Sequence, residues 1–160
     1  MSSPAANAIR DMTETVQNQT ILVVDDSDDD FAATKRAFAR AGLGNPIERC
    51  ADGDAALDYL HRRNGYADPA KSPRPGIILL DLNLPASDGR EVLRQVKSDP
   101  DLKRIPVIVL TTSGAERDIQ ACYAAGANSY VQKPVDLARF VEAVAKLKQY
   151  WFQLVILPHE

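Results

Sequence analysis

Acidic side chains stand directly after two short aliphatic runs. Residues 20–24 are followed by Asp25 and Asp26, and residues 76–80 are followed by Asp81. Continuous aliphatic runs of this length are typical of strands that are buried on both faces of a parallel sheet. Ligands in open α/β sheets bind beyond the carboxyl ends of the strands. We therefore expect the three carboxylates to meet at one edge of a sheet.

Two more polar residues stand at the ends of later apolar runs. Thr111 closes the run 106–111, and Lys133 follows the run 129–132. Three neighbouring carboxylates resist joint ionisation unless a cation lies among them. Oxygen ligands with room for water suit Mg²⁺ or Mn²⁺, so the pattern favours a divalent metal site.

A carboxylate beside such a cation can attack phosphorus and form an acyl phosphate. Phosphoryl transfer depends mainly on positioning and charge neutralisation. Here Lys133 would supply a fixed positive charge, and the Thr111 hydroxyl would donate a hydrogen bond to a phosphoryl oxygen. Acids at a helix N-terminus are also favoured by the helix dipole, and this simpler role accounts for Asp28, Asp29 and Asp30. It does not account for an acid pair that faces a third acid from another strand.

The elements that must position these residues alternate along the chain. Five predicted strands lie within 20–26, 47–51, 76–81, 106–111 and 129–132. Apolar side chains at helical spacing lie within 31–41, 53–60, 92–96, 115–125 and 136–147. This alternation implies right-handed βαβ crossovers. It predicts an α/β, flavodoxin-like (βα)5 fold: a doubly wound parallel sheet of order 2-1-3-4-5 with helices on both faces.

Composition limits the classes of function. The chain has 160 residues, which suits one domain, and its formal net charge of −3 argues against nucleic acid as the main partner. No apolar run reaches the ~20 residues that span a bilayer, and the N-terminus lacks a signal-peptide pattern. We therefore expect no membrane partner and a cytoplasmic location. The predicted domains are a flexible N-terminal tail (1–19), a folded domain (20–149) and an apolar C-terminal arm (150–160).

Four motifs carry a resemblance to a known family, and their order and spacing match it from about residue 19 to 149. They are Val-Val-Asp-Asp (23–26), Leu-Asp-Leu-Asn-Leu-Pro with Asp-Gly (80–85, 88–89), Val-Leu-Thr-Thr (109–112) and Gly-Ala-Asn-Ser-Tyr-Val-Gln-Lys-Pro (126–134). The chain resembles the response-regulator receiver domains of two-component signalling.

The resemblance implies roles for the residues at the metal site. Asp81 would be the phosphoacceptor and would receive its phosphoryl group from a histidine of a sensor kinase. The side chains of Asp26 and Asp81 and the backbone carbonyl of Asn83 would ligate the metal, with Asp25 acting mostly through water. No external substrate is expected, so the protein would be a switch rather than an enzyme.

The resemblance also implies how a phosphoryl signal would spread. Thr111 would move toward the phosphoryl group, Lys133 would pair with it, and Tyr130 would swing inward. The Lys133–Pro134 peptide bond is expected to be cis. The surface formed by the helix at 115–125, the strand at 129–132 and the helix from 136 onward would report the change.

The C-terminal segment is unusually apolar. Exposed apolar patches usually mark interfaces, so we expect a symmetric homodimer through this arm and the reporting surface, although the segment could instead fold back on its own domain. The arm residues are Trp151, Phe152, Leu154, Val155, Ile156 and Leu157. Together with the long loop at 63–75 and the segment Asn-Ser-Tyr-Val (128–131), the arm resembles the stand-alone regulators that partner bacterial phytochromes.

Three alternatives remain open at this point. A phosphatase of the haloacid-dehalogenase type would need a second Asp two residues after Asp81, where this chain has Asn83. A nucleotide-binding domain would need a Gly-rich loop after the first strand, which the sequence lacks. A receiver that acts only as an adaptor, without phosphorylation, is the third.

Overall fold

The computed structural model describes residue 4 and residues 19–154. These residues form a five-stranded parallel sheet with the order β2-β1-β3-β4-β5, which confirms the predicted fold. The strands are β1 (Thr20–Val24), β2 (Ile47–Cys50), β3 (Pro75–Leu80), β4 (Val107–Thr111) and β5 (Ser129–Gln132). The α-helices that connect and follow them are α2 (Asp28–Arg40), α3 (Gly53–His61), α4 (Gly89–Ser98), α5 (Glu116–Ala124) and α6 (Leu137–Lys148).

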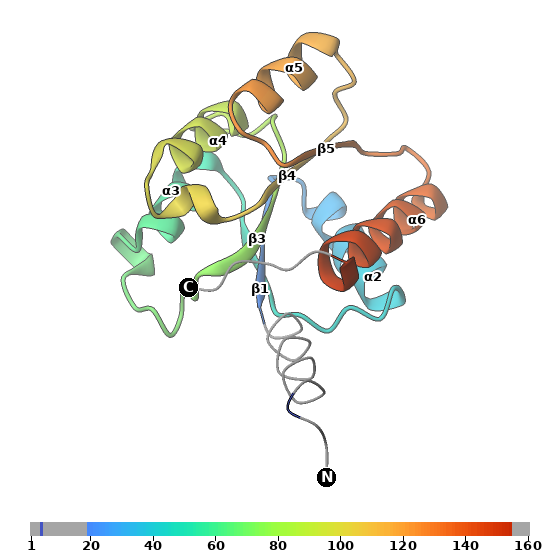
Figure 1. Ribbon diagram of the computed structural model, residues 1–160, viewed down its shortest axis with the longest axis horizontal. Coiled ribbons are helices and arrows are strands. Elements are labelled where there is room, and N and C mark those ends of the chain that lie inside the picture. Colours follow the sequence, from blue (N-terminus) through green and yellow to red (C-terminus); the bar gives the residue numbers. More distant parts are fainter. Residues whose placement is uncertain (1–3, 5–18, 155–160) are drawn as a thin grey trace.

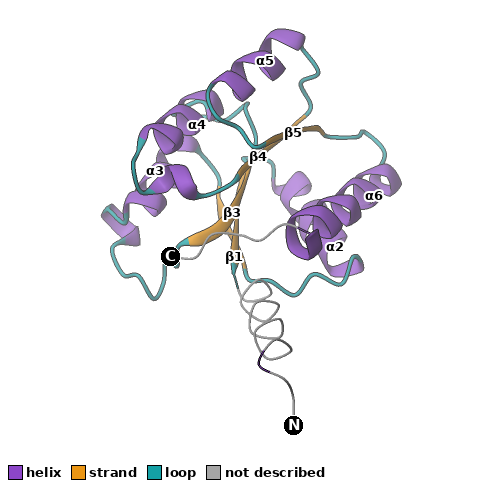
Figure 2. Ribbon diagram, viewed as in Figure 1, coloured by secondary structure: helices purple, strands orange, loops and turns teal. Residues whose placement is uncertain are grey.

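Helices cover both faces of the sheet, as Figures 1 and 2 show. α3, α4 and α5 pack on one face, where Leu57, Leu93 and Cys122 join the buried cluster. α2 and α6 pack on the other face through Phe38 and Phe140. The sheet is therefore doubly wound, as the alternating sequence pattern predicts.

Burial falls from the centre of the sheet toward β5. All residues of β1, β3 and β4 are buried, in keeping with their near-continuous aliphatic sequences. β5 lies at an edge, and its residues are half-buried or exposed. Asp25 and Asp81 thus stand at the ends of fully buried strands, while β5 is more open to solvent.

Most helix starts are fixed by side-chain caps. Ser27, Asp52, Asp88 and Asp136 each accept a hydrogen bond from a backbone N–H in the first turn of the helix that follows. α5 differs, because Ala115 at its start provides no side-chain cap.

The chain does not leave the domain at residue 150. α6 continues into a π-helix, Gln149–Leu154, that includes the backbone of Phe152 and Leu154. Trp151 is buried in the cluster on the α2–α6 face, so the expectation that it projects toward a partner is wrong. Burial of an indole removes a large apolar area from water, which stabilises this fold-back. Val155, Ile156 and Leu157 lie outside the described residues, as do residues 1–3 and 5–18 of the predicted tail.

Three further expectations concern single features. The described residues contain no cis peptide bond, so the predicted cis Lys133–Pro134 bond is wrong; trans is the lower-energy isomer of an X-Pro bond. Cys50 and Cys122 are free, buried thiols. Within the described part of the chain, no helix has the length and apolar character that crossing a bilayer requires.

Candidate functional site

The first acids are positioned by the junction of β1 and α2. Asp25 follows β1 directly and is buried, with 3% of its surface exposed, whereas Asp26 is exposed. The Ser27 N–H donates to Asp25 Oδ1 over 3.0 Å, and the Ser27 hydroxyl oxygen caps α2 by accepting from the Asp30 N–H. The start of the helix therefore holds the Asp25 carboxylate in place.

Asp81 is held by the end of β3 and the loop behind it. Its N–H donates to the Val24 carbonyl over 3.0 Å, which ties it to the neighbouring strand. Its Oδ1 accepts from the Asn83 N–H over 3.2 Å. The loop then closes because the Gly89 N–H donates to the Leu82 carbonyl, and a Cβ on Gly89 would collide with the Asp81 carbonyl oxygen. Only glycine lets α4 begin this close to the acceptor.

The three predicted acids meet, as expected. Asp25, Asp26 and Asp81 each offer a carboxylate oxygen, and these oxygens lie within 4.8 Å of one another. We call these three residues the acid cluster. Its donors are all hard oxygens, one residue is exposed to solvent, and the cluster contains neither thiolate nor imidazole. This donor set fits Mg²⁺ or Mn²⁺, which prefer carboxylates and retain water ligands.

Lys133 reaches the acid cluster from the end of β5. Its Nζ lies 2.7 Å from Asp25 Oδ2 and 3.0 Å from Asp81 Oδ2. The lysine is buried, with 7% of its surface exposed, and its N–H donates to the Thr111 carbonyl over 2.7 Å. Residues from β1, β3, β4 and β5 are thus joined at one edge of the sheet.

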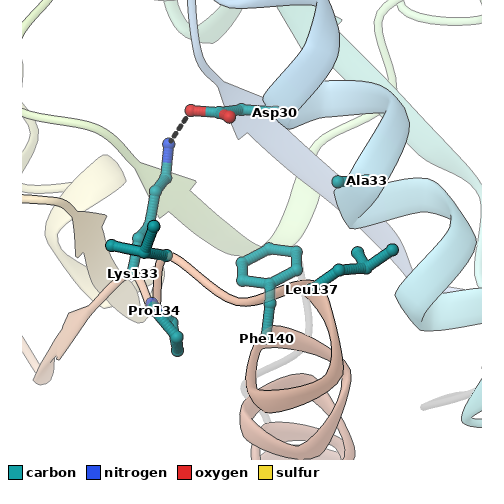
Figure 3. Close-up of a pocket in the computed structure, with 7 residues that line it drawn as sticks. Asp30, Ala33, Lys133, Pro134, Leu137 and Phe140 are labelled. Carbon is teal, nitrogen blue, oxygen red and sulfur yellow. Dashed lines mark hydrogen bonds and ion pairs between the residues drawn. The ribbon is translucent and has the colours of Figure 1, made fainter.

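A third acid contacts the same ammonium group. Asp30 Oδ2 lies 3.2 Å from Lys133 Nζ, as the dashed line in Figure 3 shows. From the sequence, Asp30 was expected only to favour the helix N-terminus, together with Asp28 and Asp29. Consecutive residues of a helix point in different directions, so the register of α2 decides which of the three acids faces the sheet edge. This register is the signal that was missed.

Burial and charge oppose each other at this contact. Burial raises the pKa of the Asp25 carboxyl, and the hydrogen bonds from Lys133 and Ser27 offset part of that rise. Burial by itself would lower the pKa of Lys133, but the hydrogen bond to Asp25 and the charges of Asp25 and Asp81 outweigh it and raise that pKa. The lysine therefore stays protonated and is a fixed cation beside Asp81.

Thr111 and Tyr130 stand on the α5 side of the site. Thr111 ends β4 and is fully buried, and its hydroxyl oxygen accepts from the Ser113 N–H over 3.5 Å. Tyr130 is half-buried and packs against the cluster under α3, α4 and α5. Its hydroxyl donates to the Ser113 carbonyl over 2.8 Å. The two residues of the predicted switch are thus linked through Ser113.

A cavity of about 200 Å³ opens beside Lys133, between α2 and the start of α6 (Figure 3). The Asp30–Lys133 ion pair is part of its lining, and the other lining residues are apolar, with Val135 and Leu137 among the exposed apolar side chains of the described structure. The lining residues are Asp30, Ala33, Lys133, Pro134, Val135, Leu137 and Phe140. An apolar rim next to the lysine offers a contact surface for a molecule that approaches the acid cluster.

Known proteins share this fold and much of the sequence. The family model for the response regulator receiver domain matches residues 21–157. The response regulator Rcp1 of Synechocystis sp. is 41% identical over 140 residues, which cover 88% of this chain and 93% of Rcp1. A probable methanogenesis regulatory protein, FilR2 of Methanothrix harundinacea, is 40% identical over 141 residues, or 88% of each chain.

A solved structure shows the same similarity in three dimensions. The phosphorylated cyanobacterial phytochrome response regulator RcpA superposes with a TM-score of 0.83, with 39% identity over 89% of this chain and 99% of RcpA. The sequence motifs, the strand order and these matches agree. The chain belongs to the response regulator receiver domain family.

Proposed function

We propose that Asp81 accepts a phosphoryl group from a histidine of a sensor kinase. A carboxylate oxygen of Asp81 attacks phosphorus, the new O–P bond forms as the P–N bond to the imidazole breaks, and the released imidazole nitrogen keeps the bond's electron pair. No external substrate is expected, so the protein would act as a switch. The observation that carries this proposal is the geometry of the acid cluster. Its carboxylate oxygens lie within 4.8 Å of one another, and the buried ammonium group of Lys133 contacts two of its three residues, Asp25 and Asp81.

The metal would be held by the side chains of Asp26 and Asp81 and the Asn83 carbonyl, with Asp25 acting through water. A bound Mg²⁺ or Mn²⁺ neutralises charge on the phosphoryl oxygens during transfer. The solved structure of Rcp1 with Mn²⁺, at 40% identity and a TM-score of 0.81, supports this assignment. Lys133 would pair with the transferred group, as its position 3.0 Å from Asp81 supports.

The response would run from Thr111 to Tyr130. A phosphoryl group adds charge and acceptor oxygens at Asp81, which favours the conformation in which the Thr111 hydroxyl reaches them. The Ser113 backbone follows Thr111, and Tyr130 is hydrogen-bonded to that backbone. The surface of α5, β5 and α6 then changes, and a downstream protein reads that surface.

The kinase that donates the phosphoryl group would be of the bacterial phytochrome type, which the similarity to RcpA supports. We place the reaction in the cytoplasm; the two free cysteines suit a reducing compartment. A symmetric homodimer would form through the α5–β5–α6 surface and residues 155–157. Exposed Tyr123, Leu137 and Tyr150 support an interface on this side.

One experiment tests the acceptor and the dimer together. The protein and its Asp81→Asn variant are incubated with acetyl phosphate, with Mg²⁺ or with EDTA, and each sample is analysed by intact mass and light scattering. We expect one added phosphoryl group in the wild-type protein with Mg²⁺ only, and none in the variant. A change in the molar mass of the phosphorylated sample would show that the dimer responds.

A phosphorylated Asp81→Asn variant would overturn the acceptor assignment. Equal phosphorylation in EDTA would overturn the metal site. A monomeric mass under every condition would overturn the dimer. Circular dichroism of the variant controls for its fold, which should be unchanged because Asn is close to Asp in size.

A further inference from the structure

Two neighbouring members of the acid cluster are held in different ways. Asp25 is buried, and its carboxylate accepts hydrogen bonds from the Ser27 N–H and from Lys133. Asp26 is exposed, so the position of its carboxylate depends mainly on the backbone that carries it. That backbone lies in the turn between β1 and α2, after the last residue of the strand and before the first turn of the helix. A contact that fixes this turn therefore bears on any metal that Asp26 ligates.

Arg49, the third residue of β2, reaches this turn from the neighbouring strand. Its Nε donates to the Asp25 carbonyl over 3.1 Å. This carbonyl belongs to the peptide group that joins Asp25 to Asp26. The Asp25 N–H donates to the Cys50 carbonyl, also over 3.1 Å. β2 thus holds the chain on both sides of Asp25, once through its backbone and once through the Arg49 side chain.

The same guanidinium group contacts the start of α2. Its Nη1 donates to Asp28 Oδ1 over 2.7 Å, and its central carbon lies 5.0 Å from the centre of the Phe31 ring. Nη2 is buried and has no hydrogen-bond partner within the described residues, so the other contacts set the orientation of the group. Asp26 therefore lies between two residues, Asp25 and Asp28, that are bound by one side chain.

We propose that Arg49 is a positioning residue that fixes the backbone of Asp25 and Asp26 and so raises the affinity of the acid cluster for Mg²⁺ or Mn²⁺. The proposal rests on the function proposed above, in which the Asp26 side chain ligates the metal. A ligand that its surroundings already hold in place loses less conformational freedom when the metal binds. The charge of Arg49 acts in the opposite direction, because one cation repels another. The sign of the change in metal affinity therefore separates positioning from charge.

Two substitutions of Arg49 divide these effects. A guanidinium group donates in two fixed directions and stacks on an aromatic ring, whereas an ammonium group is a compact point charge. Arg49→Lys keeps the charge, Arg49→Gln removes it, and both lose the bridge from the Asp25 carbonyl to Asp28. Positioning predicts weaker metal binding by both variants. Charge alone predicts tighter binding by Arg49→Gln and no change in Arg49→Lys.

The test compares these variants with the wild-type protein and with Arg74→Gln. Arg74 is a matched control, because its side chain is 20% exposed, against 21% for Arg49, and it also forms an ion pair with an aspartate, Asp101. It stands directly before β3, at the edge of the sheet opposite the acid cluster. The readouts are the Mg²⁺ affinity from titration calorimetry, the NMR position of the Asp26 amide in EDTA, and the rate of phosphorylation by acetyl phosphate as a function of Mg²⁺ concentration.

Both Arg49 variants should bind Mg²⁺ about tenfold more weakly than the wild-type protein, the lower end of the usual effect of residues that hold metal ligands in place. The Mg²⁺ concentration for half-maximal phosphorylation should rise in parallel. The rate at saturating Mg²⁺ should stay within about twofold, because the contacts of Arg49 in the described structure do not include the acceptor Asp81 or Lys133. The Asp26 amide should shift in EDTA in both variants, because the hydrogen bond to the preceding carbonyl is lost.

Unchanged or tighter Mg²⁺ binding by Arg49→Gln would overturn the proposal. Wild-type affinity in Arg49→Lys would also overturn it, since the charge alone would then be sufficient. An equal loss of affinity in Arg74→Gln would show that the effect is not specific to the turn between β1 and α2. A wild-type protein that binds no Mg²⁺ would instead overturn the metal site of the proposed function.

Discussion

α4 and α5 follow adjacent strands and cover the same face of the sheet, but they are held in different ways. α4 follows the acceptor Asp81 closely, its first turn is capped by the side chain of Asp88, and it buries an entire apolar face. α5 begins without a side-chain cap, buries one residue, and is tied to its surroundings by charge and hydrogen bonds. Apolar packing is insensitive to a new charge nearby, whereas a polar network can be rearranged by one.

The difference separates two tasks within one small domain. The acceptor must keep its geometry while phosphorus is transferred, so a rigid support behind Asp81 suits it. A surface that reports the event must have a second position within reach of a few kcal/mol. From its packing we expect α4 to be the rigid support, and under the proposed function we expect the β4–α5 segment to be the element that moves.

The largest expected contrast is in stability. Leu93→Ala should lower the free energy of unfolding by about 2–5 kcal/mol, because it opens a cavity beneath α4. Ile119→Ala removes a half-buried side chain from α5 and should cost about 1 kcal/mol or less. Urea unfolding followed by circular dichroism measures both. Equal losses would show that α5 is packed as firmly as α4.

A smaller contrast concerns two glycines at the starts of these helices. Gly89→Ala should lower stability by about 1–3 kcal/mol and slow phosphorylation, because the added methyl group meets the backbone of Asp81 and Leu82. Gly114→Ala meets the end of the flexible Gln132 side chain and should stay within about 0.5 kcal/mol. Thermal unfolding and acetyl phosphate labelling check both variants.

The matched control is Gly44→Ala, where an added methyl group meets no atom within 4 Å. If Gly89→Ala has the same stability and phosphorylation rate as this control, the close approach of α4 to Asp81 does not matter for either property. If Gly114→Ala is as damaging as Gly89→Ala, the β4–α5 segment is as constrained as the acceptor loop.

The sequence was sufficient to predict the fold and the centre of the site. Aliphatic runs that end in Asp25 and Asp81 report strands buried on both faces, and parallel strands bring their carboxyl ends together whatever lies between them. Lys133 and Thr111 follow from the same rule. These predictions need only the residue pattern within each segment and the order of the segments along the chain. Both can be read from one sequence.

The parts that the sequence did not predict depend on side-chain direction. Asp30 differs from Asp28 and Asp29 only in its register on α2, which decides that it faces Lys133. Trp151 appeared to belong to an exposed arm because apolar content alone does not say which surface buries it. The Arg90–Asp118 bond joins residues 28 apart in the chain and carries no local signature. Contacts of this kind depend on the position and rotation of each helix on the sheet, which the sequence pattern does not specify.

Hydrogen exchange with and without acetyl phosphate and Mg²⁺ tests the central claim most directly, with Asp81→Asn as the control protein. Phosphorylation should change the exchange of backbone amides in residues 112–132 of the wild-type protein, leave the buried amides of α4 unchanged, and have no effect on the variant. A change of equal size in α4, or the same change in Asp81→Asn, would contradict the division between a rigid acceptor support and a movable β4–α5 segment.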